Sequence, residues 1–288
     1  MSYEPHERLI EIDGRTRRAL VFVPDELVAS TEDRLPVVFA FHGGGSTAEG
    51  MIEFSGLAEK GRTAGFVTVF PSGTGRTPEA LTWNGGNCCG RAMKDQVDDV
   101  DFIRCFIEHL DRWLPIDRRR LYATGMSNGG MMSYRLAAEL SDQIAAIAPV
   151  GGPIGCLDCL PKRPVSVCHF HGTHDEFAPY EGGIGKRSLS KARFYSVQQS
   201  IDAWVRANGC AAAPLIDELP VVVDDGTRVT RARFCDGREG SEVWLHTIHG
   251  CGHTWPGRST SLKMLGPVTR NLNANDVMWE FFQCRRRE

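Results

Sequence analysis

The chain has 288 residues, of which 42% are hydrophobic, enough to bury one substantial core. Its 33 Lys and Arg residues nearly balance its 36 Asp and Glu residues, and the net charge of -3 argues against a nucleic-acid partner. No apolar run reaches the ~20 residues of a membrane-spanning helix, so we expect no membrane partner. Residues 1–18 contain no apolar leader. We therefore expect a cytoplasmic protein, or a secreted or periplasmic one if a leader has been removed.

Strands and helices are predicted to alternate along the chain without a linker. The expected strands are residues 18–24, 35–41, 66–70, 120–124, 144–150, 165–170 and 242–248. The expected helices are residues 97–114, 127–140, 196–207 and 275–282. This alternation predicts an α/β fold with a mostly parallel central sheet and helices on both faces. We take 1–288 as a single domain, with 1–17 as an N-terminal extension or edge segment and 285–288 as a charged, solvated tail.

A Gly-x-Ser-x-Gly pentapeptide, from Gly125 to Gly129, joins the expected strand 120–124 to the following helix. A serine on such a turn holds its hydroxyl above the end of the sheet, and the glycines remove Cβ atoms that would clash. The free N–H groups at the start of the helix face developing negative charge. A serine that only caps the helix is the alternative interpretation. The strand and helix on either side favour Ser127 as a catalytic nucleophile.

Candidate partners for Ser127 follow later strands in the chain order Ser, Asp, His, which is typical of α/β-hydrolases. Asp175 comes after the expected strand 165–170, and His253 lies in a Gly-rich loop near the end of the chain. An ionised Asp175 would orient the imidazole, which would take the serine proton and return it to a leaving alcohol. Glu176 is the alternative acid.

A Gly-Gly-Gly run follows His42 directly after the expected central strand 35–41. Alone, such a run is typical of a flexible turn, but this position predicts an oxyanion loop. We expect the N–H groups of Gly44 and Asn128 to bind the oxyanion.

Two tryptophans lie in loops next to these motifs, Trp83 and Trp255. With His42 they are candidate substrate-binding residues, because an indole ring can stack on an acyl or aromatic group. Packing beneath their own loops is the alternative. The Gly-rich segment 176–190 is a candidate rim of the same site.

Two patterns raise the possibility of zinc. Residues His169, His171 and His174 approach the His-x-His-x-Asp-His signature of binuclear zinc hydrolases, but Thr173 stands where that signature has its aspartate. Cysteines 156 and 159 have zinc-ligand spacing, but adjacent cysteines 88 and 89 make sterically poor ligands to complete the set. We expect no metal and no organic cofactor. The ten cysteines lean instead toward an oxidising compartment and at least one disulfide.

These motifs together resemble an esterase family that includes polyhydroxybutyrate depolymerases and the related feruloyl and acetylxylan esterases. The resemblance runs from about residue 18 to residue 282. It rests on residues 42–45, 83–90, 97–102, 125–132, 171–175 and 252–257.

The resemblance implies an α/β-hydrolase fold and a triad of Ser127, Asp175 and His253. It also implies two disulfide bonds. Their expected members are Cys210 with Cys235, and Cys88 or Cys89 with Cys156 or Cys159.

The expected activity is hydrolysis of small or oligomeric carboxylic esters by a serine acyl-enzyme, most of all feruloyl or hydroxycinnamoyl esters. The alternatives within the family are a polyhydroxyalkanoate depolymerase and a short-chain or acetylxylan carboxylesterase. A peptidase, a zinc hydrolase and a non-catalytic binding module are alternatives from other classes.

Overall fold

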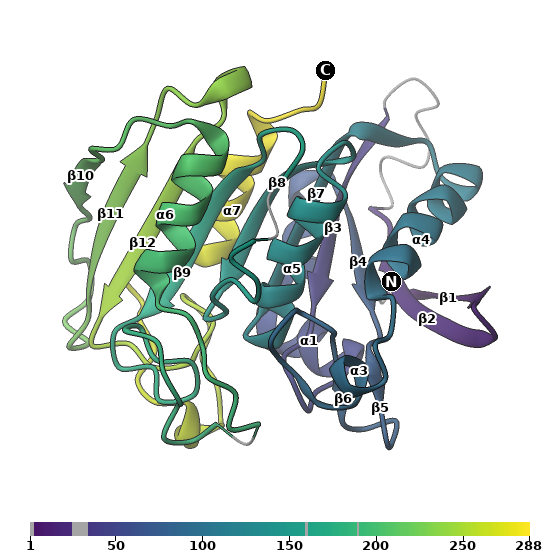
Figure 1. Ribbon diagram of the computed structural model, residues 1–288, viewed down its shortest axis with the longest axis horizontal. Helices are drawn as coiled ribbons and strands as arrows, with labels where there is room; N and C mark the ends of the chain where they lie inside the picture. The colour runs from purple at the N-terminus through teal and green to yellow at the C-terminus, as the bar shows by residue number, and fades with distance from the viewer. Residues whose placement is uncertain (1–2, 25–33, 159–160, 189) are drawn as a thin grey trace.

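The computed structural model describes residues 3–24, 34–158, 161–188 and 190–288, and within them ten strands form one sheet. These are β1 (His6–Ile12), β2 (Arg15–Phe22), β3 (Leu35–Phe41), β4 (Val67–Pro71), β7 (Ile116–Met126), β8 (Ile144–Val150), β9 (Ser166–Gly172), β10 (Leu215–Glu218), β11 (Arg228–Phe234) and β12 (Val243–His249). The spatial order is β1-β2-β4-β3-β7-β8-β9-β12-β11-β10 (Figure 1). A separate short hairpin joins β5 (Thr74–Gly75) to β6 (Leu81–Thr82).

The strands from β4 to β12 in this order pair in parallel, while antiparallel strands extend both edges. The prediction of a mostly parallel sheet is therefore confirmed. Because parallel strands end at the same edge of a sheet, the loops that follow β3, β7, β9 and β12 gather at one edge (Figure 1).

Helices cover both faces of the sheet. They are α1 (Ala48–Ser55), α2 (Leu57–Ala64), α3 (Gly90–Lys94), α4 (Asp99–Trp113), α5 (Asn128–Glu139), α6 (Val197–Asn208) and α7 (Ala274–Gln283), with short 3-10 turns η1 (Arg238–Gly240) and η2 (Lys263–Leu265). Helices α4, α5 and α6 contribute to one hydrophobic core, and α1, α2 and α7 contribute to the other. Figure 1 shows α5 and α6 in front of the sheet and α7 behind it.

Strand β3 shows why the sheet lies between two cores. All seven of its side chains are buried, because helices cover both of its faces. Val37 and Phe39 belong to the core of α4, α5 and α6, whereas Val38 and Ala40 belong to the core on the opposite face. Successive side chains of a strand point to opposite faces, so one apolar run supplies both cores.

The charged tail, predicted to be solvated, is partly buried, and that prediction is wrong for two of its three arginines. The Arg285 guanidinium pairs with Glu242 and lies 3.5 Å from the centre of the Phe281 ring. Arg287 is only 7% exposed, and its Nε donates to the Ile144 carbonyl at 3.0 Å. The chain after α7 runs back against the sheet, where a main-chain carbonyl and a carboxylate compensate the buried charges.

The other end of the chain lies at the edge of the sheet. Strand β1, within the segment predicted as an extension or edge, pairs with β2 as the outermost hairpin. No helix in the described ranges is long and apolar enough to cross a bilayer.

Candidate active site

Ser127 lies on a sharp turn between β7 and α5. Its φ of 55° and ψ of -118° are unusual for a residue with a side chain. The turn is held from the next strand, because the Ser127 N–H donates to the Val150 carbonyl at 2.8 Å. Backbone strain at such a site persists only when its surroundings impose it. This is the strained strand-to-helix geometry that exposes a nucleophilic serine in α/β-hydrolases.

The two glycines of the pentapeptide let α5 approach the end of β3. A Cβ atom on Gly125 would lie 2.7 Å from the Phe41 carbonyl oxygen. A Cβ atom on Gly129 would lie 2.6 Å from the His42 carbonyl oxygen and closer still to that of Phe41. Any larger residue at either position would therefore push the helix and its serine away from the sheet.

His253 and Asp175 form the shortest polar contact of the site. His253 Nδ1 lies 2.6 Å from Asp175 Oδ2. The other carboxylate oxygen, Oδ1, accepts the N–H groups of Phe177 and Ala178, each at 2.8 Å. Asp175 is 5% exposed and His253 is 6% exposed, so both groups are shielded from water. The carboxylate is held from two sides and fixes the imidazole.

The pKa of Asp175 decides whether it can serve as an anion. Burial by itself raises the pKa, but the charge of the His253 imidazolium and hydrogen bonds from His171 and His253 outweigh it. The pKa of Asp175 is held well below its usual range. Asp175 therefore stays ionised near neutral pH and can stabilise a protonated imidazole.

The imidazole of His253 packs close to the serine turn. A Cβ on Gly151 would lie 3.2 Å from His253 Nδ1, and a Cβ on the next glycine, Gly152, would clash with the Ser127 carbonyl oxygen. The two glycines thus let the histidine and the serine turn approach the end of β8. His253 Nε2 has no hydrogen-bond partner within the described ranges, which leaves it available for a proton. Contacts between base and nucleophile are often formed only when substrate binds.

The predicted oxyanion donors lie side by side. A Cβ on Gly44 would lie 3.5 Å from the Asn128 Cβ, and a Cβ on Gly43 would lie 3.8 Å from the Ser127 Cβ. Asn128 is the first residue of α5, so its N–H has no carbonyl partner within the helix. Among the described residues, no hydrogen bond uses the backbone N–H of Gly44 or Asn128. Two donors are thus free next to the serine.

The Asn128 side chain fastens the start of α5 to a neighbouring loop. Its Oδ1 accepts the Trp83 N–H at 2.7 Å, and its Nδ2 donates to the carbonyls of Trp83 at 3.0 Å and Cys88 at 3.3 Å. The Trp83 indole N–H donates to the His42 carbonyl at 3.0 Å. The residues of the loop before α3 therefore connect both halves of the candidate oxyanion site.

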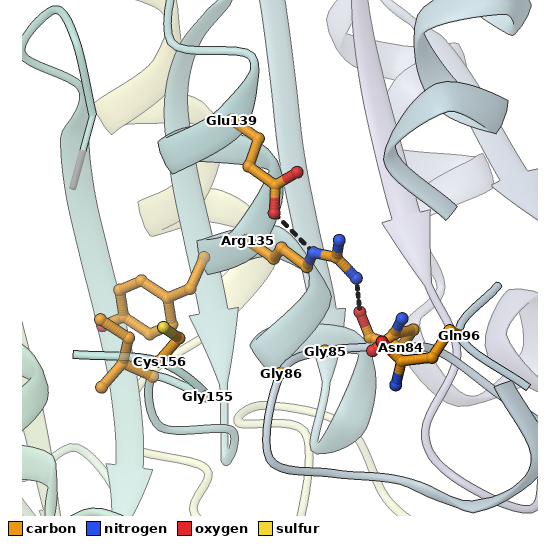
Figure 2. Close-up of a pocket in the computed structure, with 10 residues that line it drawn as sticks. Asn84, Gly85, Gly86, Gln96, Arg135, Glu139, Gly155 and Cys156 are labelled. Atoms are coloured by element: carbon orange, nitrogen blue, oxygen red, sulfur yellow. Dashed lines mark hydrogen bonds and ion pairs between the residues drawn. The ribbon is translucent and has the colours of Figure 1, made fainter. Parts of the chain in front are cut away.

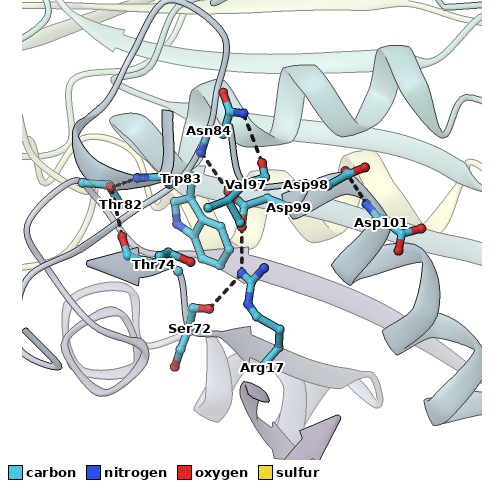
Figure 3. A network of polar contacts seen from close by, with 12 residues as sticks. Arg17, Ser72, Thr74, Thr82, Trp83, Asn84, Val97, Asp98, Asp99 and Asp101 are labelled. Carbon is cyan, nitrogen blue, oxygen red and sulfur yellow. Dashed lines mark hydrogen bonds and ion pairs between the residues drawn. The ribbon is translucent and has the colours of Figure 1, made fainter. Parts of the chain in front are cut away.

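A buried ion pair supports this loop from below (Figure 3). Arg17 Nη2 lies 2.7 Å from Asp99 Oδ1, and the other Asp99 oxygen accepts the Asn84 N–H at 2.8 Å. Asn84 Nδ2 also donates to the Val97 carbonyl at 3.1 Å. The motif at 97–102 thus acts by fixing the loop next to Trp83, away from any reacting atom.

A cavity of about 270 Å³ lies between α5 and the loop segments at residues 84–86 and 154–156 (Figure 2). Arg135 projects into it but is already paired, with Glu139 Oε1 at 2.6 Å and the Asn84 carbonyl at 2.8 Å. None of Ser127, His253 or Asp175 lines this cavity. Its polar groups hold the Asn84 loop against α5.

The three predicted substrate-binding side chains are buried beneath the site. Trp83 and His42 are 0% exposed and Trp255 is 1% exposed, and the Trp255 indole N–H donates to Asn275 Oδ1 at 2.9 Å. His42 Nε2 accepts the Gly73 N–H at 3.0 Å. Burial lowers the pKa of His42 to about 4, so its imidazole is neutral. These residues pack under their own loops, which is the alternative that the sequence left open.

An aromatic residue that sequence analysis missed lies next to the imidazole. The Phe177 ring stacks on His253 with 5.0 Å between ring centres and 22° between planes. Its side chain is half-buried. The signal was its place two residues after Asp175, on the loop that positions the acid. Glu176, the alternative acid, is exposed and pairs with Arg187 at 2.6 Å.

The histidines considered as zinc ligands make hydrogen bonds with each other. His169 Nε2 lies 3.0 Å from His171 Nδ1, and both residues are buried, whereas His174 is exposed. The described parts of the chain hold no group of three or more His, Cys, Asp or Glu side chains arranged around a metal position.

The structure corrects the disulfide that the family resemblance implies for the loop before α3. Cys88 is joined to its neighbour Cys89, and Cys156 is a free, exposed thiol. Cys159 lies outside the described residues. The pair closes within the loop itself, whose main chain Asn128 already holds.

The second implied disulfide is corrected as well. Cys210 and Cys235 are both free thiols. The Cys210 thiol contacts the Ser241 carbonyl at 3.7 Å, and the Cys235 thiol contacts the Arg233 carbonyl at 4.0 Å. Each sulfur is thus turned to a different main-chain acceptor.

Known proteins resemble this chain along most of its length, although no family model matches it. It is 30% identical over 287 residues to the protein named Putative esterase NocK of Nocardia uniformis subsp. tsuyamanensis, across 95% of this chain and 81% of NocK. It is 27% identical over 279 residues to Feruloyl esterase D of Neurospora crassa, across 94% and 83% of the two chains. It is 31% identical over 224 residues to Feruloyl esterase B of Piromyces equi, across 76% of this chain but only 39% of that relative.

Solved structures share the fold at lower identity. An acetyl xylan esterase from Aspergillus awamori matches with a TM-score of 0.64 and 14% identity, across 96% of this chain and 99% of that one. A thermostable esterase matches with a TM-score of 0.61 and 12% identity, across 99% and 63%. The predicted α/β-hydrolase fold is confirmed. The chain therefore belongs to the esterase family that contains NocK and these feruloyl esterases, and it is a carboxylic ester hydrolase.

Proposed function

We propose that Ser127, His253 and Asp175 form the catalytic triad of this esterase. The observation that supports this most is the 2.6 Å contact between His253 and Asp175, formed at the strand ends beside the strained serine turn. Ser127 follows β7, Asp175 follows β9 and His253 follows β12. These strands run in parallel and end at one edge of the sheet.

In the first step the Ser127 Oγ attacks the ester carbonyl carbon, and its proton passes to His253 Nε2. The carbonyl oxygen becomes an oxyanion, which the N–H groups of Gly44 and Asn128 stabilise. Each such donor is worth roughly 3 kcal/mol. The tetrahedral intermediate then collapses, the bond to the alcohol oxygen breaks, and that oxygen takes the proton from His253.

In the second step water attacks the acyl-serine and gives a proton to His253. The ester bond to Ser127 breaks, the carboxylic acid leaves, and His253 returns the proton to the serine oxygen. Asp175 stays ionised throughout and stabilises the imidazolium. No metal or organic cofactor enters this sequence.

The substrate that we favour is an ester of a feruloyl or other hydroxycinnamoyl acid. Two relatives that cover most of this chain bear the name feruloyl esterase. The half-exposed face of Phe177 beside His253 offers an aromatic surface at the reacting centre. Exposed apolar side chains also lie on the loops after Asp175 and His253, namely Ile184, Leu262 and Met264. Trp83 and Trp255 would support the site from beneath.

The direct test of the mechanism is Ser127→Ala. We expect the esterase rate of purified protein to fall by at least about 1,000-fold, because the nucleophile is lost while the fold is kept. A fluorophosphonate probe should label the wild type once, at Ser127, and should not label the variant. Retained turnover in Ser127→Ala would overturn the triad proposal.

The substrate proposal is tested with initial rates on methyl ferulate, p-nitrophenyl acetate and butyrate, an acetylated xylan oligomer and a hydroxybutyrate oligomer. A kcat/KM for methyl ferulate well above the others supports the hydroxycinnamoyl assignment. A preference for acetylated xylan or for the hydroxybutyrate oligomer would replace it with acetylxylan esterase or polyester depolymerase activity. Ser127→Ala serves as the blank for each substrate.

A further inference from the structure

A chain of buried hydrogen bonds between side chains ends beside Asp175. The Tyr134 hydroxyl lies 2.9 Å from His169 Nδ1, and His169 Nε2 lies 3.0 Å from His171 Nδ1. His171 Nε2 lies 2.8 Å from the Ala178 carbonyl oxygen. Tyr134 and His171 are 1% exposed and His169 is 0% exposed. Three polar side chains are thus buried in succession, and each finds a partner.

The last acceptor sets the direction of every hydrogen bond in this chain. A carbonyl oxygen only accepts, so His171 Nε2 carries the hydrogen that it donates to Ala178. When the His171 ring carries only this one hydrogen, its Nδ1 accepts, and His169 Nε2 donates to it. His169 Nδ1 is left to accept from the Tyr134 hydroxyl. Burial, followed by the nearby His171 and His246, holds the pKa of His169 well below its ordinary value, which keeps it neutral.

This chain of hydrogen bonds ends at the turn that holds the candidate catalytic acid, Asp175. His171 Nε2 is 3.4 Å from Asp175 Oδ2, the oxygen that contacts His253. The Ala178 whose carbonyl accepts from His171 also donates its own N–H to Asp175 Oδ1 at 2.8 Å. His171 therefore fixes the carboxylate twice, through a direct polar contact and through the main chain that grips it.

The other end of this chain of hydrogen bonds lies on the helix that follows the nucleophile. Tyr134 lies on α5, the helix that begins directly after Ser127, and His169 and His171 lie on β9. Burying three polar side chains costs more than burying apolar ones unless all are satisfied, and a satisfied network holds its members in one arrangement. An apolar core at this position would leave the carboxylate without its second support.

We propose that Tyr134, His169 and His171 are positioning residues for Asp175. They link α5, the helix that follows Ser127, to the loop that carries Asp175, and they set how strongly the carboxylate attracts the proton on His253. The proposal rests on the proposed triad. In the described part of the chain no hydrogen bond joins the three residues to the side chain of Ser127 or His253, so they act through Asp175. Besides the three and Asp175, the titratable groups that face them within the described ranges are Cys168 on β9, near Tyr134, His246 on β12, near His169, and Tyr180, whose ring lies edge-on to that of His171 with 5.8 Å between ring centres.

The proposal is tested by the pH dependence of kcat/KM for p-nitrophenyl butyrate, whose acid limb reports the pKa of the free enzyme's base. In His171→Leu the carboxylate loses a donor and becomes more basic. We expect the acid limb to move to higher pH by about half a unit or more and kcat to fall about tenfold or more, with KM unchanged. His171→Gln keeps a donor at the position of Nε2, so its kcat and the pH of its acid limb should both lie close to those of the wild type. Tyr134→Phe removes one oxygen atom, preserves the ring, and should lower kcat in the same direction.

The matched control is His246→Phe. His246 is as buried as His171 and lies on the neighbouring strand, but its Nε2 makes no hydrogen bond in the described part of the chain. Its pH profile should equal that of the wild type. If His171→Leu fails to fold, Tyr134→Phe and His171→Gln carry the comparison.

Fluorophosphonate labelling separates the two proposals. Absence of labelling at Ser127 in the wild type would overturn the triad itself. The positioning role alone would be overturned if the wild type is labelled and the His171→Leu and Tyr134→Phe variants have the same kcat and acid limb as the wild type. A rate loss that His246→Phe shares, or that His171→Gln does not relieve, would also overturn it, because ordinary core damage would then explain it.

Discussion

Phe177 lies where a single side chain can affect both catalysis and substrate choice. Its ring stacks on the imidazole of His253 and is half-buried, so one face packs and the other stays accessible. Aromatic pairs contribute about 0.5–1.5 kcal/mol beyond their buried area. Phe177 is therefore the residue at which we expect an aromatic acyl group to be recognised.

The prediction at this residue uses Phe177→Leu, which keeps an apolar side chain against His253 and removes the aromatic face. We expect kcat/KM for methyl ferulate to fall about tenfold, the effect of about 1.4 kcal/mol of lost contact energy, while kcat/KM for p-nitrophenyl acetate stays within about twofold. Steady-state kinetics on both substrates provide the measurement. An equal loss on both would show that the ring only holds the imidazole.

Among the elements, helix α5 connects several functional parts of the site. It begins at the serine turn, offers the Asn128 N–H, and carries Tyr134 toward β9. Its position depends on Gly129, where the helix lies against the main chain at the end of β3. Alanine is a better helix former than glycine by about 1 kcal/mol, so propensity alone would favour a replacement.

We expect Gly129→Ala to be destabilising in spite of that propensity, because the new Cβ would meet fixed carbonyl oxygens. The free energy of unfolding should fall by about 2 kcal/mol or more, and kcat should fall with it as the oxyanion donors separate. Urea unfolding and esterase kinetics measure the two effects. The control is Gly50→Ala in α1, where a Cβ would meet two side-chain hydroxyls and no main chain, the movable Ser46 hydroxyl at 2.7 Å and the Thr47 hydroxyl at 3.7 Å. A Gly129→Ala protein as stable and active as Gly50→Ala would contradict this account.

For the whole molecule, buried neutral histidines make stability depend on pH. Burial lowers the pKa of His42 to about 4 and that of His246 to about 3, and holds that of His169 well below its ordinary value. The unfolded chain takes up these protons near pH 6.5, whereas the folded chain does not. The stabilising contribution is therefore complete above about pH 6.5 and is lost as the pH falls toward the folded pKa values.

We expect the free energy of unfolding to be several kcal/mol lower at about pH 4.5 than at about pH 7, with each buried histidine contributing on the order of 3 kcal/mol over the full interval. His246→Phe should flatten this dependence, and it keeps an aromatic ring against Phe170, on which His246 stacks at 4.7 Å. Urea unfolding at both pH values is the measurement. At about pH 4.5 Asp175 is still ionised, because its pKa lies below its usual range. Protonation of Asp175 therefore does not contribute to the difference between the two pH values. An unchanged slope in His246→Phe would sink this explanation.

Local patterns in the sequence determined a large part of this protein. The apolar runs at 35–41 and 144–150 correspond to β3 and β8 residue for residue, because strands buried on both faces must be continuously apolar. Helices α1 and α2 escaped prediction, since each has only eight residues and Gly56 separates them. The serine turn and the Ser, Asp, His order were readable because each lies directly after a strand, where local chemistry and position coincide.

What the sequence could not settle depended on which side chains meet in space. It left the tryptophans either exposed to substrate or buried, and only packing placed Trp83 and Trp255 beneath the site. It offered His169 and His171 as zinc ligands. The two lie two positions apart on β9, so their side chains share one face of the strand, where they hydrogen-bond to each other and His169 contacts Tyr134 on α5. Strand-to-strand contacts span long stretches of chain, so partner choice, burial and the direction of each hydrogen bond were decided by the tertiary structure, while motif identity and strand position were fixed by local sequence alone.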